Sequence, residues 1–81
     1  MAKFQEQIAL NVTRDRTGWE AMGTSNLLKN IDHNFQSMLR ADDIGALKDK
    51  EYQHLVEARK EVKKAARRLA AISRSMQHDR H

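Results

Sequence analysis

Four large apolar residues recur at every seventh position near the carboxyl end of the chain: Leu55, Val62, Leu69 and Met76. The first three are each followed, three residues later, by Ala58, Ala65 and Ile72, which completes an a/d heptad pattern. Such a pattern points one stripe of a helix at a partner helix. The stretch contains no proline or glycine and few β-branched residues, so nothing in it interrupts a helix. We therefore expect a long helix over residues 50–77, with this apolar seam along one side.

The other side of the predicted helix carries a dense group of cations, here called the basic ridge: Arg59, Lys60, Lys63, Lys64, Arg67 and Arg68. Only Glu61 within this stretch and Glu57 just before it offset the charge. Cations four residues apart repel each other on a helix surface, so the arrangement favours a surface for an anionic partner: a phosphate backbone, an acidic protein patch or anionic lipid, of which lipid is the weakest candidate. The alternative is a solvated face whose long side chains cover the flanks of the helix.

Residues 25–40 form a second predicted helix, which is amphipathic. Its apolar residues fall on one face when the chain is wound at the helical period: Leu27, Leu28, Ile31, Phe35, Met38 and Leu39. Gly23 comes just before this segment, and Thr24 and Ser25 can cap a helix that starts there. We therefore expect the chain to break at Gly23 and the helix to begin directly after it.

A connection over residues 41–49 separates the two predicted helices, and Asp42, Asp43 or Asp49 can cap the second of them. Its length allows 25–40 to fold back against 50–77. The expected fold is all-α: an antiparallel helical hairpin with a coiled-coil contact, a short N-terminal helix or arm, a long basic C-terminal helix and a frayed tail at 78–81. The long helix would outrun its partner by about 15 Å, so oligomerisation is expected to complete the fold.

Residues 1–23 give mixed signals and are expected to form an arm and a loop. Within residues 1–12, apolar residues follow both a helical spacing and a strand-like alternation. A strand would have no partner elsewhere, so a short helix or a docked arm is preferred. Residues 13–18 are polar and end in glycine, which predicts a loop. Trp19, the only tryptophan, is interpreted either as an anchor beneath that loop or, if exposed, as an interface residue.

The sequence offers no set of residues suited to catalysis. Its carboxylates are scattered, no serine or threonine has a histidine and an acid at a recognisable spacing, and there is no glycine-rich phosphate loop. The chain has no cysteine, and its few histidines do not form a convincing metal site. We expect a protein without enzymatic activity, cofactor or metal.

Composition narrows the expected function further. The 81 residues make one small domain with a net charge of +4, and neither a membrane-spanning run nor a signal peptide is apparent, which favours a cytoplasmic protein without a membrane partner. We expect a small interaction or regulatory module, like accessory factors and inhibitors of bacterial or phage type, that binds itself and another protein. The alternative is a non-specific nucleic-acid-binding protein that uses the basic ridge. The expected interface residues are Trp19, Leu55, Val62, Leu69, Ile72 and Met76.

Overall fold

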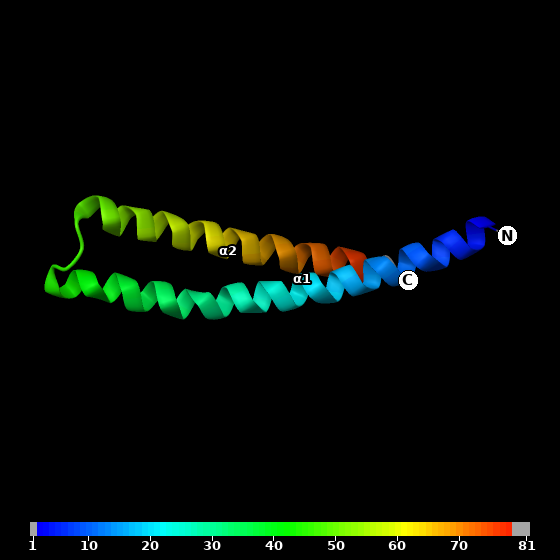
Figure 1. Ribbon diagram of the computed structural model, residues 1–81, viewed down its shortest axis with the longest axis horizontal. Coiled ribbons are helices and arrows are strands. Elements are labelled where there is room, and N and C mark those ends of the chain that lie inside the picture. Colours follow the sequence, from blue (N-terminus) through cyan, green and yellow to red (C-terminus); the bar gives the residue numbers. More distant parts are fainter. Residues whose placement is uncertain (1, 79–81) are drawn as a thin grey trace.

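The computed structural model of the protein describes residues 2–78, with side chains from residue 4 to residue 77. It consists of two long helices joined by a short connection (Figure 1): α1, Ala2–Arg40, and α2, Asp49–His78. The helices run antiparallel and pack against each other. The prediction of an all-α antiparallel hairpin is therefore confirmed.

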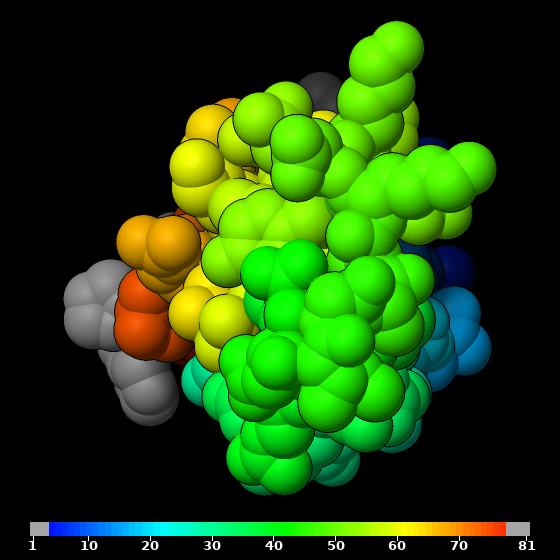
Figure 2. Space-filling view, turned by 90° about the vertical axis from the view of Figure 1, so that its left-hand side faces the viewer, coloured from blue at the N-terminus to red at the C-terminus, as the bar shows by residue number. Residues whose placement is uncertain are grey.

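The molecule is long and only two helices thick. Its extents are 67 × 18 × 16 Å, and the view from the end that carries the connection shows one helix stacked on the other (Figure 2). Among the described apolar residues only Ala21 and Ala66 are buried. Each helix thus keeps one narrow side against its neighbour and exposes the rest of its surface.

The connection consists of a 3-10 turn, η1 (Ala41–Ile44), followed by Gly45 and three further residues. Gly45 has φ 72°, a left-handed conformation that glycine adopts without strain. The backbone N–H of Lys48 donates to the Glu51 carboxylate (2.8 Å) and so caps the next helix. Of the starts considered for that helix, the later one at Asp49 is observed, because the chain leaves the 3-10 turn at Gly45.

α1 is continuous where the sequence predicted a loop and a break. The predicted loop at residues 13–18 and the predicted break at Gly23 are both helical, so the expected N-terminal arm is part of α1. Packing against α2 overrides the local signals, because Gly18 and Ser25 lie buried in the contact between the helices. The Ser25 hydroxyl donates to the Ala66 carbonyl of α2 (2.7 Å) instead of capping a helix.

α2 faces α1 with the predicted apolar seam but with a different second row. The seam residues are partly buried: Leu55, Val62, Leu69 and Met76. The most buried positions of the second row lie four residues after Val62 and Leu69, at Ala66 and Ser73, while Ala58 and Ala65 of the predicted row are partly buried, as is Arg59. Ile72 is instead 42% exposed. The close approach of α1 through Gly18 and Ser25 leaves space for small side chains at positions 66 and 73, which an apolar pattern does not reveal.

The longer helix is α1, with 39 residues against 30 in α2. The expectation that α2 would extend past its partner is wrong. Gly18 of α1 already lies beside Met76 near the end of α2, and α1 begins still earlier in the chain, at Ala2. The N-terminal end of α1 projects past α2 instead (Figure 1), and its described side chains at 4–13 are all exposed. Of the predicted frayed tail at 78–81, His78 ends α2 and the other residues lie outside the described part.

Candidate anion-binding surface

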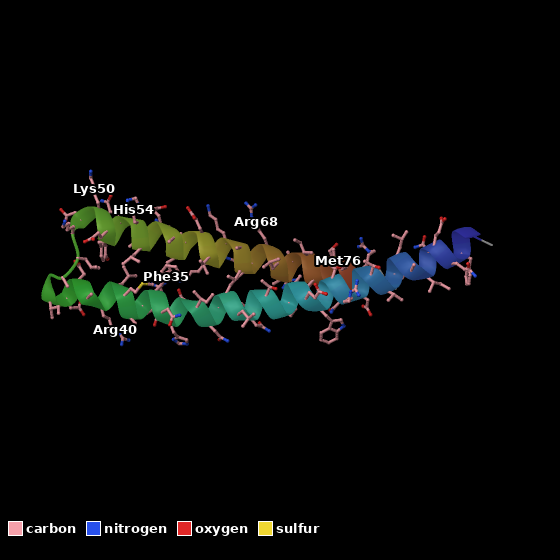
Figure 3. The ribbon with its side chains drawn as sticks, in the orientation of Figure 1. Phe35, Arg40, Lys50, His54, Arg68 and Met76 are labelled. Carbon is pink, nitrogen blue, oxygen red and sulfur yellow. The ribbon has the colours of Figure 1, made fainter. Side chains whose placement is uncertain are left out.

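Five of the six basic-ridge residues are exposed on α2: Lys60, Lys63, Lys64, Arg67 and Arg68. Figure 3 shows Arg68 pointing away from α1, as does Lys50 near the start of α2. A carboxylate oxygen of Glu57 lies 3.5 Å from the ammonium group of Lys60, with both side chains about two-thirds exposed. Arg59 departs from the prediction, because it turns toward α1 and is engaged there.

An ion pair between Arg59 and Asp32 joins the two helices. Nε of Arg59 donates to Oδ1 of Asp32 (2.6 Å) and Nη2 donates to Oδ2 (3.0 Å). Gln36 also donates to Oδ2 (3.2 Å). The hydrogen bonds from Arg59, with a smaller effect of nearby Lys63, hold the pKa of Asp32 below its usual range, and Asp32 in turn raises the pKa of Arg59. The pair is thus charged and internally satisfied, so Arg59 contributes little to binding an outside anion.

A groove of about 270 Å³ lies between the helices beside this ion pair. Its lining comes equally from α1 and α2: Leu28, Lys29, Asp32, Lys63, Ala66 and Arg67. Three of these side chains are cations, and the one acid is already held by Arg59. Leu28 and Ala66 add apolar surface between the charges. The groove therefore combines an apolar contact with a positively charged rim.

Lys29 was missed by the sequence analysis, which placed the cationic surface on α2 alone. The Arg59–Asp32 pair brings this part of α1 beside α2, so that Lys29 shares the groove with Lys63 and Arg67. One signal was available: Asp32 is the only acid within residues 25–40, and an acid beside an apolar stripe usually needs a partner. The identity of that partner depends on the register of the two helices, which the pattern does not give.

No family model, curated protein or solved structure matches this chain. Its function must therefore be inferred from its own surface. Within residues 2–78, no three His, Asp or Glu residues are placed to hold a metal ion. Neither described helix has an apolar stretch sufficient to cross a membrane.

The predicted interface residues fall into two groups in the structure. The four seam residues, Leu55, Val62, Leu69 and Met76, lie on the side of α2 that faces α1, and Figure 3 shows Met76 and Phe35 between the helices. Trp19 and Ile72 are 67% and 42% exposed. Because Trp19 lies on a continuous helix and not beneath a loop, its remaining interpretation is that of an interface residue.

Proposed function

We propose that the hairpin is a small non-enzymatic interaction module, of regulatory or accessory type, that binds an acidic segment of another protein. The groove between α1 and α2 supports this proposal. A segment that alternates carboxylates with apolar side chains would place its charges against Lys29, Lys63 and Arg67 and its apolar groups against Leu28 and Ala66. Recognition would then combine charge complementarity with burial of apolar surface.

The outer side of α2 favours a second candidate, non-specific binding of nucleic acid. Lys60, Lys64 and Arg68 are exposed at intervals of four residues and so form a row about 12 Å long at the helical rise. Such a row can neutralise successive phosphates and release their counterions. The basic ridge contains no aromatic residue to stack on bases, so this binding would depend on phosphate contacts.

Binding measured by fluorescence anisotropy across a salt series separates the two candidates. The probes are a labelled amphipathic helical peptide of Glu and Leu residues, a labelled mixed-sequence DNA duplex and a labelled single strand. The groove variant is Lys29→Gln with Lys63→Gln, and its matched control is the ridge variant, Lys60→Gln with Lys64→Gln. Because both variants lose two positive charges, a difference between them reports the location of the contact and not the net charge.

The proposed function predicts that the groove variant binds the acidic peptide about tenfold more weakly, as expected for the loss of two charge-assisted contacts. The ridge variant should lose less than about threefold, because its charges are exposed and screened. Steeply salt-dependent DNA binding that the ridge variant weakens most would instead support the nucleic-acid candidate. If none of the probes binds at low salt, both candidates are wrong.

A further inference from the structure

The side of α1 that faces away from α2 carries large apolar side chains. Gly18, Ala21 and Ser25 are buried and so define the side of α1 that faces α2. At 100° per residue, position 23 lies on nearly the opposite side of the helix. Trp19, Leu27 and Ile31 share this outer side with Gly23, at successive intervals of four residues. Their exposed fractions are 67%, 63% and 40%, so this face, here called the outer face of α1, has no partner within the described hairpin.

The middle of the outer face is also free of charge. Between Ala21 and Leu39, α1 contains only Lys29 and Asp32 among Lys, Arg, Asp and Glu, and both of these line the groove next to α2. The polar residues on the outer face are mainly asparagines: Asn26, Asn30 and Asn34. An uncharged face with large apolar side chains is typical of the core of a protein interface.

Gly23 has no role in the fold of the hairpin. Its φ angle is not positive, unlike that of Gly45, and apart from its chain neighbours and the adjoining backbone of α1, no atom of the described residues lies within 4 Å of the place where a Cβ would stand. At Gly18, by contrast, that place is 3.4 Å from Cβ of Met76. A glycine inside a helix destabilises it relative to alanine. Such a residue is useful where another backbone must approach closely, which points to a contact outside the hairpin.

We propose that two copies of this chain form a symmetric dimer in which their α1 helices cross at Gly23. An antiparallel two-fold arrangement centred on this residue places Trp19 of one copy beside Leu27 of the second copy, with Gly23 facing Gly23. Trp19 and Leu27 lie four residues on either side of Gly23. Each copy therefore presents to its partner the same surface that it binds, as a two-fold interface requires.

The charges agree with this arrangement. About the same two-fold axis, Arg16 of one copy faces Asn30 of the second copy, Glu20 faces Asn26, and Asp15 faces Ile31 at the edge of the contact. No like charges are brought together, and Arg16 and Glu20 each meet an amide that can bond to them. The dimer goes beyond the function proposed above and does not depend on it, since the contact uses the side of α1 opposite α2 and leaves both basic ridges exposed.

The chain has no cysteine, so disulfide cross-linking tests the crossing point directly. A cysteine on a two-fold axis lies opposite the same cysteine of the second chain. Gly23→Cys should therefore cross-link under mild oxidation at least tenfold faster than the control Lys64→Cys, which lies on the exposed side of α2. Trp19 is the only tryptophan, so its emission should be blue-shifted in the dimer and should shift to the red on dilution.

A second variant separates dimerisation from folding. Leu27 is 63% exposed in the hairpin, so Leu27→Glu should keep its helicity while the dissociation constant of the dimer rises at least about a hundredfold. The proposal is overturned if the unmodified chain sediments as a monomer at high micromolar concentration, if Leu27→Glu stays dimeric, or if the two cysteine variants cross-link equally fast. Peptide affinity measured on monomeric Leu27→Glu tests the groove separately, so the two proposals can fail independently.

Discussion

Replacing two buried serines by alanine tests how the contact between α1 and α2 is stabilised. Ser25 on α1 and Ser73 on α2 are both fully buried. The Ser25 hydroxyl donates to the Ala66 carbonyl at 2.7 Å, whereas Oγ of Ser73 has no hydrogen-bond partner among the described residues. The same substitution should therefore change the free energy of unfolding in opposite directions at the two sites.

The expected magnitudes follow from three contributions. Ser73→Ala removes a buried hydroxyl without a partner, which costs about 1 kcal/mol or more in the folded state, and alanine favours the helix by about 0.5 kcal/mol. A small loss of packing offsets part of this gain, which leaves a stabilisation of about 1 kcal/mol. Ser25→Ala loses a hydrogen bond of about 1 kcal/mol and gains the same helix preference, so a net destabilisation of about 0.5 kcal/mol is expected.

Thermal unfolding followed by far-ultraviolet circular dichroism measures both effects at one fixed protein concentration. For a domain of this size, 1 kcal/mol corresponds to a change in Tm of about 4–8 °C, so the two variants should lie on opposite sides of the unmodified protein. Ser37→Ala and Ser75→Ala are matched controls, because these serines are exposed on α1 and α2 and report helix preference alone. If Ser25→Ala and Ser73→Ala shift the Tm equally and in the direction of their controls, the reasoning about buried hydroxyls is wrong.

Three further predictions concern the contact between the helices. Gly18→Ala should keep or raise the Tm, because a Cβ there meets Met76 at an ordinary contact distance of 3.4 Å, whereas Gly18→Leu should lose about 1–3 kcal/mol through overpacking; urea unfolding of both variants checks this. The pKa of Asp32 is held below its ordinary value of 3.8 by Arg59, so the unfolded chain binds this proton more readily and stability should fall as the pH drops below about 4. Asp32→Asn should be less stable at neutral pH and should lack this part of the pH dependence, and an unchanged acid profile would contradict the ion-pair assignment. Leu69→Asp should lose at least about 2 kcal/mol and much of its helicity, since the seam lies inside the hairpin; full helicity would show that the seam is not a folding contact.

The hairpin could be predicted because its main signals are local and agree with one another. The seven-residue spacing of Leu55, Val62, Leu69 and Met76 predicted which side of α2 faces a partner helix. The predicted range of 50–77 differs from the observed Asp49–His78 by one residue at each end. The continuity of α1 was not predictable from Gly18 and Gly23, since glycine signals a break locally and only packing against α2 reverses that preference.

The candidate site could be predicted in part. The exposed lysines and arginines of α2 follow from composition and period, but the position of Arg59 does not, because it depends on a single acid, Asp32, on the other helix. The same register decides that Lys29 joins the groove. Contacts between residues about 30 positions apart require the relative placement of two helices, which a one-dimensional pattern does not contain.

The most direct test of the binding account is an NMR titration of the isotope-labelled full chain with the acidic amphipathic peptide. The account predicts that backbone amide signals on both sides of the groove shift together, at Lys29 and Asp32 on α1 and at Lys63, Ala66 and Arg67 on α2. Shifts confined to the outer side of α2 around Lys60 and Lys64, or no shifts at low salt, would contradict it.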